Sequence, residues 1–379
     1  MDHPLSSATI GLLSTFPPTR CGLATFSQSL AASLVESHGA SIRTVRVMDE
    51  LAVPGSAAPG RGQEVVAELV AGDPRSISAA ARALSRTEVA VIQHEYGIYG
   101  GPDGSEVIDV LEQLTVPAVV VLHTVLETPS PTQRLVLERV AALADAVVVM
   151  TAVAAEILER CYDVDPHRVG VIAHGVPVWS GATAPGSRPE RPRIITWGLI
   201  GPGKGIEWGI RAIAELRAAG VQASYTVHGQ THPKVLASHG EAYRDSLAAL
   251  VAELGLEDDV VLDGRYLDPG ELAAAVAGAD AVLLPYDSRN QVTSGVLVEA
   301  LSAGKPVVAT AFPHALELLG GPQGRAVAHQ DPSAMARGLD EVLAATGGAA
   351  AIVPAALSWP DAAGRYLDLI ERLRVERAA

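Results

Sequence analysis

The sequence predicts an α/β protein with two domains, each built on a parallel sheet, and three observations support this prediction. Short apolar runs alternate with helical stretches along the chain, which is the order of elements in a parallel α/β sheet. The length of 379 residues suits two domains better than a single core. A segment rich in proline, glycine and serine, residues 179–192, divides the chain. We therefore expect a first domain over 1–180 and a second over 193–355.

Composition narrows the class of protein. Hydrophobic residues make up 48% and charged residues 19%, which indicates a globular chain. A net charge of −15 without a long basic run, together with 4% aromatic residues, argues against nucleic-acid binding. The two cysteines, Cys21 and Cys161, form neither a disulfide framework nor a zinc pattern. With no signal-peptide pattern and no membrane-length apolar run, we expect a cytoplasmic protein without an integral membrane segment. The oligomeric state is left open.

The first predicted strand, residues 9–14, leads into a loop and then a helix from about 23 to 37. The loop after the first strand of an open parallel sheet lies at the carboxyl edge, where ligands bind. Gly22 would let a ligand approach the backbone closely, and Arg20 could attract an anion or ligand group. The alternative for Arg20 is a solvated surface charge.

Two later strands of the first domain end in polar residues. The strand from 89 runs into His94, Glu95 and Tyr96, and burial of a histidine or glutamate costs free energy without a partner. An active-site role and a structural hydrogen-bond network are both open. The strand 116–123 ends in His123 before a polar loop, which favours a site over a core histidine. The remaining elements are strands over 42–48, 146–150 and 169–171, helices over 77–84 and 133–143, and a helix capped by Thr151.

The second domain opens with a strand over 193–197, the loop G-L-I-G-P-G-K-G, and a helix over 206–218 with one apolar face. The loop matches the start of a P-loop, but Gly205 stands where a magnesium-binding Ser or Thr is needed. A P-loop nucleotide triphosphatase is therefore only a minor alternative. The interpretation we prefer is that Lys204 reaches a diphosphate as a point charge, while Gly203 lets backbone amides come close.

A second candidate site follows the predicted strand 281–284. Thr293, Ser294 and Gly295 open a short helix, and a strand over 306–309 comes next. Free N–H groups at a helix start, together with the positive end of its dipole, suit a phosphate. Glu299 lies one turn further along, where a carboxylate can accept two hydrogen bonds from a ribose diol. The alternative is an ordinary capped helix that carries a surface glutamate.

The stretch P-Y-D-S-R-N-Q-V-T-S-G-V-L-V-E-A-L-S-A-G-K-P-V-V-A-T, residues 285–310, resembles the donor-site segment of retaining, nucleotide-sugar-dependent glycosyltransferases of the GT-B architecture (group 1, family 4 type). In that family two glutamates separated by seven residues bracket the sugar and the ribose. Glu299 matches the second, and Gln291 stands in place of the first. The resemblance covers nearly the whole chain. It implies two Rossmann-like domains with a cleft between them, and a C-terminal helix over 356–379 that crosses back to the first domain.

The resemblance also implies a reaction. A hexosyl group would move from a GDP- or UDP-linked sugar, with mannose one candidate, to a carbohydrate or small-molecule acceptor, with retention at the anomeric carbon. The nucleotide sugar would be a co-substrate, and we expect no cofactor and no metal. We assign catalytic roles to His123, Lys204 and Gln291. The expected donor-binding residues are Gly22, Gly203, Arg265, Tyr266, Thr293, Ser294, Gly295 and Glu299, and the expected acceptor-binding residues are Arg20, His94, Glu95 and Tyr96.

Three positions depart from the family pattern. Leu199 replaces an arginine after the first glycine of the Lys204 loop, His174 replaces an asparagine, and the neutral Gln291 cannot stabilise positive charge as a glutamate would. The cation absent at Leu199 could come from Arg20 or Arg265. Two alternatives therefore stay open: a nucleotide-sugar-binding protein with little or no transfer activity, and a phosphorylase-like or hydrolysing enzyme on the same fold.

Overall fold

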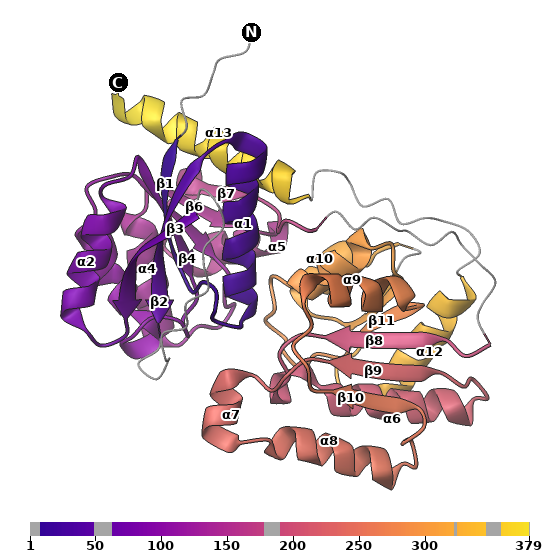
Figure 1. Cartoon of the computed structure of the whole chain (residues 1–379). Helices are drawn as coiled ribbons and strands as arrows, with labels where there is room; N and C mark the ends of the chain where they lie inside the picture. Colours follow the sequence, from indigo (N-terminus) through magenta and orange to yellow (C-terminus); the bar gives the residue numbers. More distant parts are fainter. Residues whose placement is uncertain (1–7, 49–62, 178–189, 322–323, 346–357, 379) are drawn as a thin grey trace. The chain divides into compact units, whose positions relative to one another are not determined.

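The computed structural model describes residues 8–48, 63–177, 190–321, 324–345 and 358–378 (Figure 1). The chain divides into two compact units, one of Met1–Gly175 with Ala355–Ala379 and one of Val176–Pro354. Most of the expected linker over 179–192 lies outside the described residues. The final helix, α13 (Trp359–Ala378), belongs to the first unit although it follows the second in sequence.

Within the described residues, the first unit contains a seven-stranded parallel sheet in the order β3-β2-β1-β4-β5-β6-β7. Its strands are β1 (Thr9–Ser14), β2 (Ser41–Met48), β3 (Gln63–Val70), β4 (Val89–His94), β5 (Ala118–Leu122), β6 (Ala146–Val149) and β7 (Val169–Val171). The strand order reverses between β1 and β4. Ligands of open α/β sheets bind at the carboxyl ends of strands that flank such a reversal.

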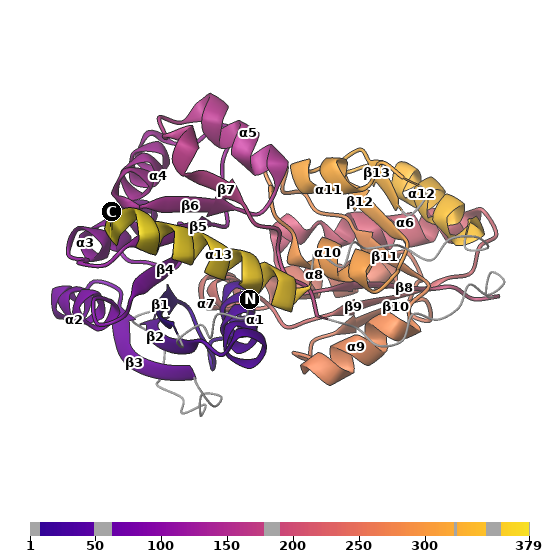
Figure 2. The same cartoon turned by 90° about the horizontal axis from the view of Figure 1, so that it is seen from above.

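Helices cover both faces of this sheet. The first unit contains α1 (Gly22–His38), α2 (Pro74–Leu84), α3 (Glu106–Glu112), α4 (Pro131–Leu143) and α5 (Ala152–Cys161). On one face, Phe26 and Leu30 of α1 form a core with Val91, Val121 and Tyr366. Tyr366 belongs to α13, which lies beside α1 (Figures 1 and 2). The C-terminal helix therefore completes the core of the first unit.

The second unit contains a six-stranded parallel sheet, β10-β9-β8-β11-β12-β13, within the described residues. Its strands are β8 (Arg193–Trp197), β9 (Ser224–His228), β10 (Val260–Asp263), β11 (Ala281–Leu284), β12 (Val307–Thr310) and β13 (Gly324–Val327). Its helices are α6 (Ile206–Ala218), α7 (Pro233–His239), α8 (Ala242–Glu253), α9 (Pro269–Gly278), α10 (Gly295–Ser302), α11 (Pro313–Leu318) and α12 (Pro332–Ala344). The strand order reverses between β8 and β11.

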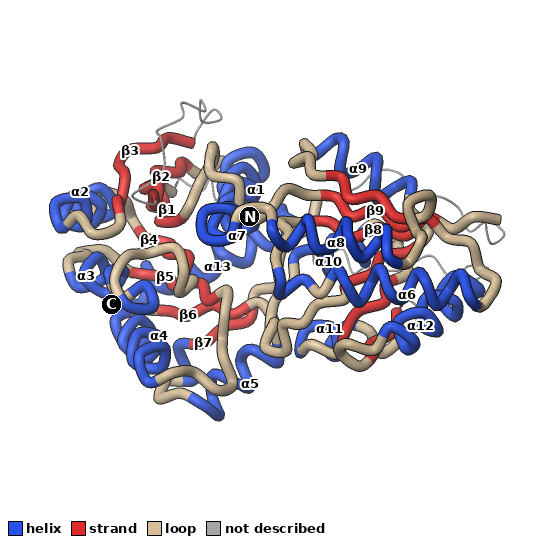
Figure 3. Tube along the Cα trace, turned by 90° about the horizontal axis from the view of Figure 1, so that it is seen from below, coloured by secondary structure: helices blue, strands red, loops and turns tan. Residues whose placement is uncertain are grey.

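Two apolar layers enclose this second sheet. Helices α6, α8 and α12 pack over one face, which Figure 3 shows from below, and residues of α9, α10 and α11 pack over the other. The apolar face predicted for residues 206–218 is confirmed, because Ile206, Ile210, Ile213 and Leu216 are all buried. None of the helices in the described ranges combines the length and apolar character needed to cross a bilayer.

The α/β class with two parallel-sheet domains is confirmed. Two edge strands, β3 and β13, were not predicted. Residues inside each of them are only partly buried, so their apolar pattern is weak. The short helix α7 was also missed, because it has no buried residue.

Candidate functional site

In the second unit, the loop after β8 lies against the loop after β11, at the point where the strand order reverses. Gly203 O accepts a hydrogen bond from Asp287 N at 3.1 Å. Gly205 has a φ of +56°, and a Cβ there would lie 2.1 Å from Pro285 O. Only glycine fits this turn. The hydroxyl residue that a P-loop needs at position 205 is therefore excluded by the local backbone.

Lys204 lies next to an aromatic ring at this edge. Its Nζ is 4.2 Å from the centre of the Tyr286 ring. Burial lowers the pKa of Lys204 to about 8. Within the described part of the chain, no carboxylate forms an ion pair with this ammonium group. The geometry leaves a half-buried positive charge at the edge of the sheet, and such a charge can bind an anion.

The start of α10 is the second part of this site. Ser294 caps the helix, since its Oγ accepts from Leu297 N at 3.3 Å, and Ser294 N donates to His314 Nδ1 at 2.9 Å. The amide of Ser294 is thus already used, which leaves those of Gly295 and Val296 for an anion. Thr293 Oγ1 is buried without a partner among the described residues. Sequence reasoning missed His314, because a single histidine near the start of a short helix carries no pattern.

Glu299 connects α10 to the end of β8. Its Oε2 accepts from Trp197 Nε1 at 3.1 Å. Burial raises the pKa of Glu299 to about 7, although the Trp197 bond acts in the opposite direction. Gln291, eight residues earlier in sequence, donates from Nε2 to Thr293 O at 3.2 Å. Lys204, Gln291, the start of α10 and Glu299 therefore belong to one carboxyl edge of the second sheet.

Arg265 and Tyr266 follow the edge strand β10 and have no described contact with Lys204. The Arg265 guanidinium is paired with two acidic side chains, at 2.8 Å from Asp263 Oδ2 and 3.3 Å from Glu271 Oε1. Its charge is thus already balanced, so the structure does not make it the replacement for the cation absent at Leu199. The Tyr266 side chain is 41% exposed.

In the first unit, His123 follows β5 directly. Its Nε2 donates to Gln93 Oε1 at 2.7 Å, and its ring packs edge-on against Phe26 at 4.8 Å. Burial, followed by the neighbouring His174 and His94, lowers the pKa of His123 to about 3. The imidazole is therefore neutral at physiological pH, and the Gln93 bond leaves Nδ1 as a hydrogen-bond acceptor.

The polar residues at the end of β4 and directly after it differ in their hydrogen-bond partners. His94 is fully buried, and both ring nitrogens lack a partner among the described residues. Glu95 belongs to a local network, because its Oε2 accepts from Thr124 Oγ1 at 2.5 Å and its Oε1 from Tyr96 N at 3.0 Å. The Tyr96 ring lies edge-on to His94 at 5.1 Å. The structural network anticipated for these positions thus exists for Glu95 and not for His94.

The loop after β1 ends at α1. Cys21 caps this helix with its Sγ, which accepts from Ala24 N at 3.4 Å. Arg20 and Gly22 are both exposed, and a Cβ at Gly22 would meet no atom within 4 Å. The backbone at Gly22 is therefore accessible, and its role in ligand binding stays a prediction.

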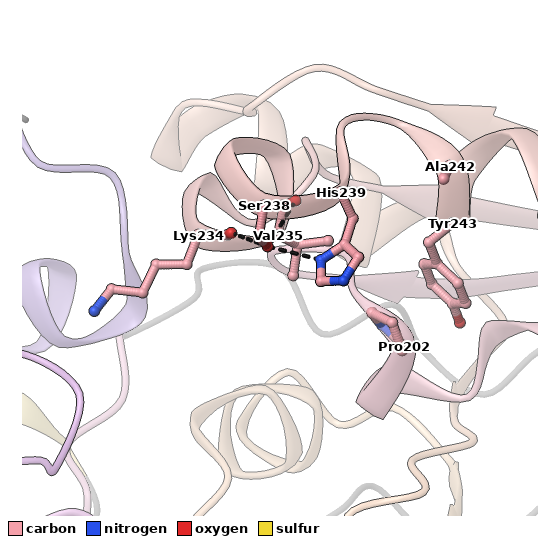
Figure 4. Close-up of a pocket in the computed structure, with 7 residues that line it drawn as sticks. All are labelled: Pro202, Lys234, Val235, Ser238, His239, Ala242 and Tyr243. Atoms are coloured by element: carbon pink, nitrogen blue, oxygen red, sulfur yellow. Dashed lines mark hydrogen bonds between the residues drawn. The ribbon is translucent and has the colours of Figure 1, made fainter. Parts of the chain in front are cut away.

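A pocket lies beside the glycine-rich loop of the second unit (Figure 4). Its lining residues are Pro202, Lys234, Val235, Ser238, His239, Ala242 and Tyr243. The Lys234 side chain points away from the other lining residues. None of the predicted site residues lines this pocket. In the described ranges, no three His, Cys, Asp or Glu side chains gather as a metal-binding group.

Known proteins share these features. Residues 22–179 match the family model Glycosyltransferase Family 4, and residues 191–345 match the model Glycosyl transferases group 1. The chain belongs to these glycosyltransferases. Its relatives include the D-inositol 3-phosphate glycosyltransferase of Nocardioides sp., 33% identical over 66% of this chain and 58% of that one. That of Xylanimonas cellulosilytica is 29% identical over 71% of this chain and 69% of that one. The chain spans about half the length of the first curated relatives it matches.

Solved structures place this family member in the GT-B fold. A glycosyltransferase from Rickettsia africae superposes with a TM-score of 0.73 at 13% identity, over 97% of this chain and 99% of that one. Anabaena HepE, solved with UDP and glucose, superposes with a TM-score of 0.73 at 15% identity, over 95% and 99%. The expected GT-B fold is confirmed.

Proposed function

We propose that this protein is a retaining hexosyltransferase that uses a GDP- or UDP-linked sugar and needs no metal. The observation that carries the proposal is the position of Lys204, whose ammonium group has no described carboxylate partner and lies where the strand order reverses. An unbalanced, half-buried cation at that edge is suited to a diphosphate. Family membership supports the same class of reaction.

The second unit would bind the donor. Loss of a nucleoside diphosphate from the anomeric carbon builds negative charge on the leaving phosphate. Lys204 and the amides of Gly295 and Val296 would stabilise that charge. Glu299 would accept hydrogen bonds from the ribose hydroxyls, and the backbone at 264–266 would contact the base.

The first unit would supply His123 for the transferred sugar and the polar residues after β1 and β4 for the acceptor. A neutral His123 with a free Nδ1 lone pair can accept a hydrogen bond from a sugar hydroxyl. The relatives carry the name D-inositol 3-phosphate glycosyltransferase. A phosphorylated cyclic polyol is therefore the first acceptor class to test.

The experiment starts with thermal shifts in GDP, UDP and ADP, because a ligand that binds only the native state raises its melting temperature. The corresponding nucleotide sugars are then incubated with D-inositol 3-phosphate and with simple hexosides, with and without EDTA. We expect one nucleotide to stabilise the protein, and an α-linked donor to give an α-linked product in EDTA. An inverted product, or activity abolished by EDTA and restored by a divalent cation, contradicts the mechanism proposed.

A second candidate is a nucleotide-sugar-binding protein or hydrolase. The observation in its favour is Gln291, whose amide bonds to the Thr293 carbonyl and carries no charge. Tight nucleotide binding without transfer to any acceptor supports the binding protein. Release of free sugar at the same rate with and without acceptor supports the hydrolase.

A further inference from the structure

Tyr286 packs with Lys204 and with a second aromatic ring. Its side chain is fully buried, and its ring stacks on Phe312 with centroids 5.6 Å apart and planes at 22°. The Lys204 Nζ lies 4.2 Å from the centre of the same ring. The three side chains come from the loop after β8, the loop after β11 and the residue before α11.

The backbone holds both partners in place. Tyr286 O accepts from Thr310 Oγ1 at 2.7 Å and from His329 Nδ1 at 2.8 Å. The left-handed turn at Gly205 directly follows Lys204 and lies against Pro285, the neighbour of Tyr286. The backbone segments that carry the ring and the lysine are therefore held by separate contacts of the protein itself, which places the two side chains side by side.

The chemistry of this pair differs from that of an ion pair. The face of an aromatic ring attracts an ammonium ion but does not neutralise its charge. A carboxylate in the same place would compete with a phosphate. The nearby charged and titratable groups are His232 and Asp287. Burial, followed by Lys234 and Lys204, lowers the pKa of His232 at the start of α7, and Asp287 Oδ2 accepts from Trp208 Nε1. Neither takes the place of an anionic partner for Lys204.

We propose that Tyr286 is a positioning residue, whose ring holds the Lys204 ammonium group in place for the diphosphate of the donor. The step from a positioned lysine to donor binding rests on the proposed function, whereas the ring–ammonium contact itself does not. The hydroxyl of Tyr286 lies beside the Ser294 side chain at the start of α10. The Tyr286→Phe variant therefore separates the role of the ring from that of the hydroxyl.

The contact can be measured without activity, because the sequence contains only three lysines, Lys204, Lys234 and Lys305. Reductive methylation with ¹³C-formaldehyde keeps the charge on each lysine and gives an NMR signal for each of the three, besides that of the N-terminal amine. The signal lost in Lys204→Arg is that of Lys204. We expect an upfield ring-current shift for Lys204 in the wild type and in Tyr286→Phe, and its loss in Tyr286→Leu. Ile213→Ala, on the buried face of α6, controls for general destabilisation.

Donor affinity is then measured by calorimetry with GDP and UDP on unmethylated protein. We expect Tyr286→Leu to weaken binding about tenfold, the scale of one desolvated cation–π contact, and Tyr286→Phe and Ile213→Ala to bind as the wild type does. The absence of a ring-current shift in the wild type overturns the proposal, as does unchanged affinity in Tyr286→Leu. If the wild type itself binds no nucleoside diphosphate, the proposed function fails, and the NMR result alone then decides whether the ring–ammonium contact exists.

Discussion

At the scale of single residues, Lys204 is the group on which the proposed chemistry depends. Removal of one donor that stabilises transition-state charge costs about 10²-fold in turnover. We expect Lys204→Ala to lower kcat by about this factor in a steady-state transfer assay. Arg211→Ala is the matched control, because Arg211 is an exposed cation on α6 of the same unit. A wild-type kcat in Lys204→Ala would remove this residue from the mechanism.

Glu299 gives a prediction about pH and stability. Burial raises its pKa to about 7 in the folded protein, above the ordinary value of 4.5. The folded state then holds the proton more tightly than the unfolded state, so stability is lost as the pH rises from about 4.5 to about 7. The loss is at most about 3 kcal/mol. In Glu299→Gln the side chain at this position does not titrate, so the variant does not lose this stability as the pH rises.

Urea unfolding at pH 5 and pH 8 measures this effect. We expect the wild type to lose stability relative to Glu299→Gln between the two pH values. The same difference at both pH values would mean that the carboxylate is solvated in the native protein. Calorimetry at pH 8 adds the functional readout, because an uncharged amide should bind the ribose of a nucleotide more weakly than a carboxylate does.

His123 should affect the sugar and not the nucleotide. Its pKa of about 3 keeps the ring neutral, and Gln93 fixes which nitrogen carries the proton. We expect His123→Ala to lower kcat by about 10- to 100-fold while the Kd of the nucleoside diphosphate stays unchanged. The reverse pattern, with weaker nucleotide binding and normal turnover, would place His123 in a different subsite.

At the scale of elements, the turn between β8 and α6 shows why this loop needs a glycine. In Gly205→Ala, the alanine would have to adopt a left-handed backbone conformation, and its Cβ would lie 2.1 Å from Pro285 O. We expect a loss of about 3 kcal/mol or more of folding free energy, measured by urea unfolding. Gly203→Ala is the matched control, since its Cβ would meet no atom within 4 Å and should leave stability unchanged.

The sequence predicted most elements of both domains because buried parallel strands appear as short continuous apolar runs. The helix predicted over 206–218 matches the observed bounds of α6. The edge strand β3 was missed because residues within it are only partly buried, so its alternation is weak. Thr151 was correctly predicted as a cap, since its hydroxyl accepts from Ala154 N.

The site was predictable where strand ends supply its residues, and not where contacts come from elsewhere in the chain. Lys204 and the start of α10 were chosen as candidates because both follow apolar strands, and the structure places both at the carboxyl edge of the second sheet. The bond from Ser294 N to His314 joins residues twenty apart in sequence, and no local pattern reveals it. The pairing of Arg265 with Asp263 and Glu271 also depends on side-chain directions that spacing does not give.

At the scale of the whole molecule, the first unit is closed by the last helix of the chain. Trp359, the first residue of α13, lies 5.0 Å from Phe26 and 5.4 Å from His174, ring centre to ring centre. Gly175 leaves room for it, because a Cβ there would lie 2.3 Å from the Trp359 ring. The resemblance implied that residues 356–379 return to the first domain, and the helix α13 does pack against α1.

This arrangement predicts which unit a C-terminal change destabilises. We expect Trp359→Ala to cost the first unit about 3–5 kcal/mol, the usual scale for truncating a buried aromatic side chain. In a calorimetric scan the transition of the first unit should fall, while that of the second stays in place. Ile213→Ala should lower the transition of the second unit and leave that of the first unit unchanged. An equal fall of both transitions in either variant would mean that the units unfold together.

Because the first unit combines residues from before and after the second unit, it cannot finish folding until the second unit has been translated. Residues 176–354 must be translated before the closing segment from 355 onward exists. At ordinary translation speeds this takes on the order of 10 to 40 seconds. Throughout that interval the apolar side of α1 is not yet covered by α13. The nascent protein therefore exposes an apolar surface that chaperones and neighbouring polypeptides can bind. A stop codon directly after residue 354 should therefore yield insoluble protein, although it removes none of the residues assigned to chemistry.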